Sequence, residues 1–111
     1  MSNPQKRKGD AAELEAAALL HDLLGVPARR KLGAGRLDDT GDIDGVPDLT
    51  VQVANWSNVG AAVSQKPAEC EQQTAKAGTA FGVTMVRIRG GRWVMVQTPA
   101  QFAALYREAT A

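Results

Sequence analysis

The sequence has few residues for disulfide or zinc chemistry, since it contains one cysteine, Cys70, and one histidine, His21. A single cysteine excludes an internal disulfide and a zinc site built from several cysteines, and it is typical of a protein of the reducing cytosol. His21 falls within an apolar helical stretch, so we interpret it as a packing or surface residue rather than as a metal ligand or base.

Long hydrophobic runs and net charge are lacking as well. No apolar run approaches the roughly 20 residues that cross a bilayer, and the N-terminus lacks the apolar stretch of a secretory signal. We therefore expect a cytoplasmic protein without a membrane partner. The net charge is only +1, so any basic surface must come from local clustering. Aromatic residues are few, and we interpret Trp56 and Trp93 as core or dimer-interface residues rather than base-stacking platforms.

A chain of 111 residues can form one domain with a core of modest size. We expect a basic flexible tail over residues 1–8 and a single domain over residues 9–111. Periodicity and turn signals predict three helices over 11–24, 65–77 and from 99 onward, strands over 27–32, 80–88 and 92–97, a loop over 33–41 and a hairpin over 42–55. The order is α-β-β-β-α-β-β-α, an α/β fold with a central mixed five-stranded sheet flanked by helices.

Three sets of capping residues support the predicted helices. Asp10 with Glu13 has the spacing of a capping box, Ser64 precedes the second helix, and Thr98 with Gln101 forms a capping box before the third. The third helix is expected to bury Phe102 and Leu105, with Tyr106 as a further candidate.

Residues 41–55 read GDIDGVPDLTVQVAN and are the most informative segment. Asp42 opens a first strand, a turn follows over 44–48, and a second strand spans 49–55. Strand side chains alternate between the two faces of a sheet, so positions 52 and 54 point the same way. Asp44 and Asp48 are interpreted as turn residues.

This segment and the element order resemble the PD-(D/E)XK nuclease superfamily, and more closely the small Holliday junction resolvase-type endonucleases of actinobacterial phages. The resemblance implies a restriction-endonuclease-like fold. The matching pieces cover most of the chain: Lys8-Gly9 with Glu13, Arg29-Arg30, Gly41-Asp42-Ile43, Gly45-Val46-Pro47, Val51, Val53, Asn55 and Gln101-Phe102.

The resemblance implies Mg²⁺-dependent hydrolysis of DNA phosphodiesters, with Mn²⁺ as a substitute metal. Asp42, Gln52 and the carbonyl of Val53 would be the metal ligands. The family motif reads Glu-x-Lys, so Gln52 stands at the glutamate position and Ala54 at the lysine position. An amide carries no charge and a methyl group cannot position water, so metal binding and activity are expected to be weak or lost.

Three points about this expected site stay open. The residues at positions 52 and 54 could be natural or engineered replacements. Lys66 on the following helix is a candidate for the missing lysine. Glu13 has two interpretations, as a capping residue of its own helix or as a catalytic-site residue that faces Asp42.

Local basic clusters are expected to contact DNA phosphates; their members are Lys6, Arg7, Lys8, Arg29, Arg30, Lys31 and Arg36. The leading hypothesis is a structure-specific endonuclease for branched or duplex DNA, acting in the host cytoplasm if the protein is phage-encoded. The two-fold symmetry of a four-way junction implies a homodimer. The alternatives are a non-catalytic DNA-binding module on the same fold and a phage protein that binds a host protein.

Overall fold

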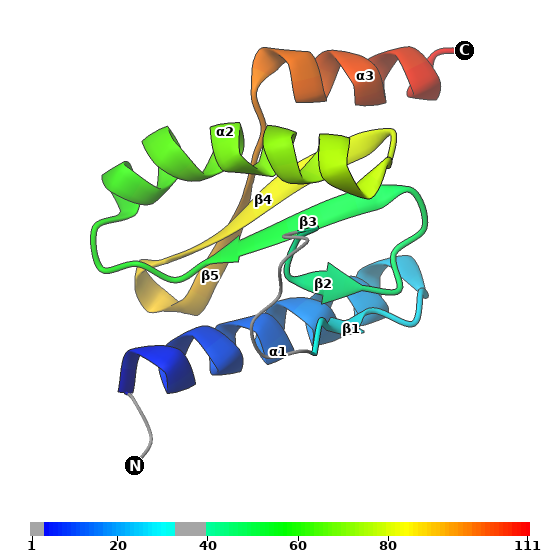
Figure 1. The fold of residues 1–111 in the computed structure, drawn as a ribbon. Helices are drawn as coiled ribbons and strands as arrows, with labels where there is room; N and C mark the ends of the chain where they lie inside the picture. Colours follow the sequence, from blue (N-terminus) through cyan, green and yellow to red (C-terminus); the bar gives the residue numbers. More distant parts are fainter. Residues whose placement is uncertain (1–3, 33–39) are drawn as a thin grey trace.

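The computed structural model describes residues 4–32 and 40–111. Along the chain, the elements are α1 (Pro4–Leu24), β1 (Arg29–Arg30), β2 (Ile43–Asp44), β3 (Leu49–Ala54), α2 (Val59–Ala77), β4 (Phe81–Ile88), a short 3₁₀ turn (Arg89–Gly91), β5 (Arg92–Val96) and α3 (Pro99–Ala109) (Figure 1). The α/β class and the mixed five-stranded sheet are therefore confirmed.

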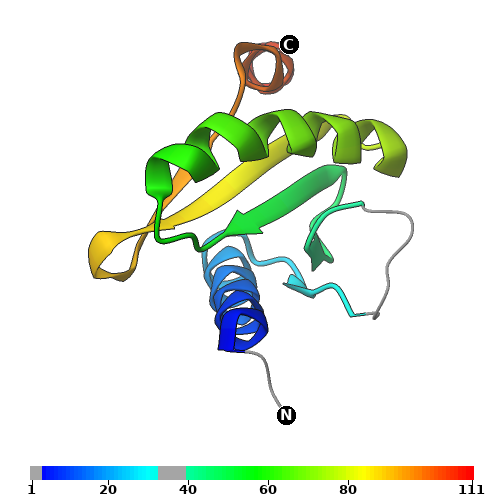
Figure 2. The same ribbon diagram turned by 60° about the vertical axis from the view of Figure 1, so that its left-hand side comes forward.

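The sheet has the strand order β1-β2-β3-β4-β5. β3 and β4 are parallel and are joined by the crossover helix α2, whereas the other neighbours are antiparallel. Helices α1 and α2 lie on opposite sides of the sheet (Figure 2). Val51 packs with Ala16 and Leu20 of α1, while Ala54 packs with Ala62 of α2. Alternate residues of β3 thus contribute to two separate apolar clusters.

Helix α1 begins at Pro4, earlier than the sequence predicted. Residues 4–8 are therefore helical and not part of a tail, while residues 1–3 lie outside the described part of the chain. Proline is tolerated in a first helical turn, where its missing N–H has no partner to lose. Lys6 and Asp10 form an i,i+4 ion pair of 2.9 Å, so Asp10 lies inside the helix and the prediction that it caps the helix is wrong.

Helix α2 also begins earlier than predicted, at Val59. The cap is Asn58, whose side chain accepts a hydrogen bond from Ala61 N, and not Ser64. Pro67 accordingly lies buried in the helix interior. Ala62 in this added first part of the helix is fully buried and packs against the sheet residues Ala54 and Val86.

Helix α3 has the predicted capping box of Thr98 and Gln101, but its apolar side chains are not buried. Phe102 is 58% exposed, Leu105 43% and Tyr106 58%. The buried residue is instead Gln101. The helix packs mainly against β4, and its least exposed residues, Gln101, Ala103 and Ala104, lie in its first half. None of the helices within residues 4–32 and 40–111 combines the length and apolar character needed to cross a membrane.

Candidate functional site

The turn between β2 and β3 is fixed by backbone geometry. Gly45 has a φ of 87°, and a Cβ atom there would collide with the carbonyl oxygen of Pro27. Asp48 has a φ of 59°, and its carboxylate accepts a hydrogen bond of 2.8 Å from Ala80 N. The turn role predicted for Asp48 is confirmed, and both Gly45 and Asp48 have a structural explanation independent of catalysis.

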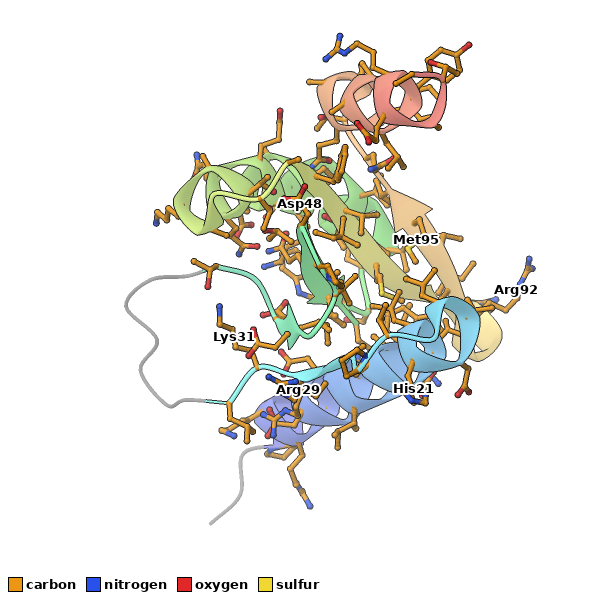
Figure 3. The ribbon with its side chains drawn as sticks, turned by 90° about the vertical axis from the view of Figure 1, so that its right-hand side faces the viewer. His21, Arg29, Lys31, Asp48, Arg92 and Met95 are labelled. Carbon is orange, nitrogen blue, oxygen red and sulfur yellow. The ribbon has the colours of Figure 1, made fainter. Side chains whose placement is uncertain are left out.

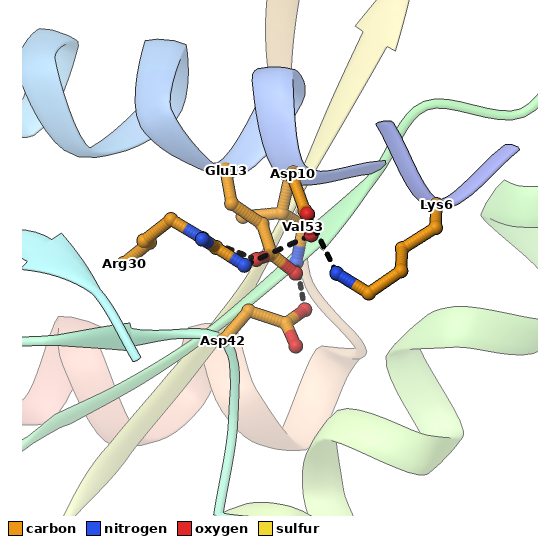
Figure 4. Close-up of polar contacts among 6 residues, drawn as sticks. All are labelled: Lys6, Asp10, Glu13, Arg30, Asp42 and Val53. Atoms are coloured by element: carbon orange, nitrogen blue, oxygen red, sulfur yellow. Dashed lines mark hydrogen bonds and ion pairs between the residues drawn. The ribbon is translucent and has the colours of Figure 1, made fainter. Parts of the chain in front are cut away.

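Asp42 lies beside the middle of β3. Its N–H donates to the carbonyl of Val51 at 2.8 Å, and its carboxylate accepts a hydrogen bond of 2.8 Å from Val53 N. A side-chain oxygen thus takes the place that a backbone carbonyl would hold in a regular ladder. In Figure 4 this carboxylate points toward Val53 and toward the α1 side chains Asp10 and Glu13. We call Asp10, Glu13 and Asp42 the acidic cluster.

Arg30 binds two members of the acidic cluster. Its Nη2 lies 2.9 Å from Asp10 Oδ1, and its Nε lies 3.3 Å from Glu13 Oε1 (Figure 4). The side chain of Glu13 is 14% exposed and that of Arg30 is 26% exposed, so this ion pair is partly shielded from water. The interpretation of Glu13 as a helix-capping residue is wrong, because helix α1 starts nine residues earlier, at Pro4, and the Glu13 carboxylate faces Arg30.

Gln52 and Ala54 are buried on the α2 face of the sheet, at 3% and 2% exposure. Ala54 packs with Ala62 and Val86. Asp42 is bonded instead to the amide of Val53, at the edge of the strand. The expected pocket formed jointly by positions 42, 52 and 54 is therefore not present. The physical reason is strand alternation: positions 52 and 54 share a face of the sheet, as predicted, but α2 covers that face.

The predicted magnesium ligands do not fit the ion as they are arranged. Mg²⁺ requires near-octahedral oxygen ligands and usually keeps several waters. Gln52 is almost inaccessible to water, and the Asp42 carboxylate already accepts a hydrogen bond from Val53 N. The neighbouring carboxylates of Asp10 and Glu13 are bound by the guanidinium of Arg30. Within the described residues, no three His, Cys, Asp or Glu side chains are grouped so that they could hold a metal ion.

Two adjoining hollows lie at the end of the sheet where β3 and β4 finish and α2 begins. Their volumes are about 410 and about 430 Å³, and both are lined by Lys8, Asn55, Trp56 and Ser57. Arg87 and Arg89 line the second hollow. The start of α1, the β3–α2 connection and the β4–β5 turn meet at this end of the molecule (Figures 1 and 2). We call the joined hollows the basic groove.

Side-chain contacts hold the walls of the basic groove in place. Arg87 donates from Nε to Glu15 Oε1 at 3.1 Å, and Trp93 donates from Nε1 to the same oxygen at 2.7 Å. These two hydrogen bonds, that of Trp93 first, lower the pKa of Glu15. The ammonium of Lys66 lies 5.0 Å from the centre of the Trp56 ring, a cation–π distance. Lys66 thus has a place beside Trp56, and its predicted role as a substitute catalytic lysine stays a prediction.

The predicted DNA-binding residues do not form one surface but lie in different parts of the structure. Lys6 and Arg30 are engaged by the acidic cluster, and Lys31 donates to Thr40 Oγ1. Arg29 and Lys31 lie at the β1 edge of the sheet, whereas Arg92 and Met95 lie on β5 at the other edge (Figure 3). Lys8 lines the basic groove, Arg7 is exposed on the same helix, and Arg36 lies outside the described residues.

Arg87, Arg89 and Ser57 were not assigned to a site from the sequence, and Asn55 was named only among the residues that carry the resemblance. A signal for them was present, because ligands of open α/β sheets commonly bind outside the carboxyl ends of parallel strands. Residues 55–57 and 87–89 directly follow or end the two parallel strands β3 and β4.

Comparison of this chain with protein-family models, curated proteins and solved structures gives no match in any of the three. The resemblance to PD-(D/E)XK nucleases therefore stays a hypothesis. It is carried by the motif residues and by the element order alone.

Proposed function

We propose that this protein binds DNA through the basic groove, on a nuclease-like fold whose hydrolytic site is incomplete. The observation that carries the proposal is the chemistry of the groove. Lys8 and Arg89 line it together with amide and hydroxyl side chains and with Arg87, which is paired with Glu15. The described residues that line the groove include no carboxylate. In a chain of net charge +1, this segregation favours a polyanionic ligand, and phosphate backbones supply most of the affinity in such contacts.

The position of the groove supports the same proposal. It lies outside the carboxyl ends of two parallel strands, the usual ligand-binding place in open α/β sheets. The order of helices and strands agrees with the restriction-endonuclease-like architecture implied by the resemblance. Branched DNA remains the proposed substrate class and a homodimer the proposed assembly, because a junction has two-fold symmetry.

Equilibrium binding of labelled duplex and four-way junction DNA tests the proposal. We expect the logarithm of the association constant to fall linearly with the logarithm of salt concentration, with no requirement for a divalent metal. Lys8→Gln and Arg89→Gln should each reduce that slope by about 1. Arg107→Gln removes an equal charge from α3, does not line the groove, and should leave the slope unchanged. An association constant that does not change with salt concentration, or a slope that all three variants reduce equally, would refute the proposal.

A second candidate is the Mg²⁺-dependent, resolvase-like endonuclease with an impaired site. It is favoured by Asp42 and Glu13, which point toward the same place in Figure 4. The test is the double variant Gln52→Glu with Ala54→Lys, assayed for nicking of branched DNA with magnesium. Because α2 covers both positions, we expect no nicking. Cleavage by this variant, absent from an Ala54→Lys control, would instead favour the endonuclease.

A further inference from the structure

Trp56 is the aromatic side chain among the described residues that line the basic groove, and it contributes to both hollows. The indole is half-buried and packs beside Ala54, Ala62 and Val86. This packing, together with the cation–π contact from Lys66, holds the ring as part of the groove wall. The other tryptophan, Trp93, does not line the groove and donates its indole N–H to Glu15.

Duplex DNA cannot stack a base on Trp56, because the faces of its bases are covered by the neighbouring bases. An unpaired base offers its face to an aromatic ring, and such stacking contributes about 1–3 kcal/mol per base whatever the base. Cations near such a ring can hold the neighbouring phosphates. The basic groove brings these groups together: Trp56 and Lys8 line both hollows, and Arg89 of the β4–β5 turn lines the second hollow.

On the basis of the proposed function, we propose that the basic groove binds single-stranded DNA, with an unpaired base against Trp56 and the neighbouring phosphates at Lys8 and Arg89. Asn55 and Ser57 lie in the same groove and offer donors and acceptors to base edges. The substrate is thereby narrowed from DNA in general to single strands and to unpaired nucleotides at branch points. The core interpretation of Trp56 agrees with its packing beside Ala54, Ala62 and Val86, and the proposal adds a base-stacking role for the part of the ring that lines the groove.

The test uses the full chain carrying Trp93→Phe, whose folding is first checked by circular dichroism, so that Trp56 is the only indole. Oligo(dT) of about 12 nucleotides, a duplex of equal length and an abasic strand of equal charge are titrated at fixed salt. We expect oligo(dT) to quench Trp56 fluorescence and to bind more tightly than either control. Trp56→Leu should weaken oligo(dT) binding roughly ten- to hundred-fold, and Trp56→Phe should retain most of the affinity.

The outcomes separate this inference from the proposed function. If none of the DNA ligands binds, the proposed function itself fails. If all three bind alike, or if Trp56 fluorescence and the Trp56→Leu variant do not respond, the protein binds phosphates only and the single-strand assignment is wrong. A preference for the duplex overturns the assignment in the same way. The comparison of oligo(dT) with the abasic strand needs no substitution at Trp56, so it decides the matter even if Trp56→Leu fails to fold.

Discussion

Replacing Gln52 with leucine should stabilise this protein. Gln52 is 3% exposed, and among the described residues its Oε1 has no hydrogen-bond partner. A buried polar group without a partner costs about 1–3 kcal/mol, whereas an apolar group of similar shape carries no such cost. Leucine has a similar volume and would contact the α2 side of the sheet. We expect the free energy of unfolding to rise by about 1 kcal/mol and the midpoint of thermal unfolding to rise by about 4 °C.

Urea and thermal unfolding followed by circular dichroism measure this change. Gln72→Leu is the matched control, because it makes the same replacement at an exposed position of α2 and should change stability by less than about 0.5 kcal/mol. Gln52→Glu extends the test. Burial raises the pKa of a carboxyl group, so this variant should lose stability as the pH rises above the ordinary carboxyl range and regain it when acidified.

Two results would refute the reasoning about Gln52. If Gln52→Leu lowers the free energy of unfolding by 1 kcal/mol or more (about the contribution of one hydrogen bond), the Gln52 side chain forms hydrogen bonds that stabilise the folded protein. If Gln52→Glu is as stable at neutral pH as in acid, position 52 is open to water or to a cation. The second result would also restore the predicted metal-ligand role of this position.

Three further predictions concern the surroundings of the groove and the acidic cluster. Arg30→Ala should lower the free energy of unfolding in urea by about 1.5–3 kcal/mol, because two carboxylates lose charged hydrogen bonds; an unchanged midpoint would contradict this. Hydrogen bonds from Trp93 and Arg87 lower the pKa of Glu15 below its ordinary 4.5. In thermal unfolding, the native protein should therefore be more stable than Glu15→Gln by a constant amount above pH 4.5, and this difference should shrink as the pH falls below 4.5. Gly45→Ala should cost about 1–3 kcal/mol more than Gly78→Ala, since only the alanine at position 45 meets backbone atoms; equal losses in urea would exclude that clash.

Local signals predicted β4, β5 and the start of the third helix well, whereas the strand predicted over 27–32 is limited to Arg29–Arg30. The periodicity and turn signals placed β4 and β5 within one residue of their observed ends. Thr98 and Gln101 placed the start of α3, because a capping box depends only on residues three apart. Helix starts were less accurate where a cap-like residue, Asp10 or Ser64, lies inside a helix that an earlier residue begins. Such side chains satisfy capping patterns in sequence without being at a helix end.

The sequence by itself determined the α/β class, the order of the elements, the turn role of Asp48 and the common face of positions 52 and 54. These follow from periodicity and from local backbone preferences, which need no distant contacts. Only the tertiary structure decided which helix covers that common face, that Arg30 binds the acidic cluster, and that Lys8, Trp56 and Arg89 line one groove. Such proximities join residues far apart in the chain, and they depend on how α1 and α2 pack against opposite sides of the sheet.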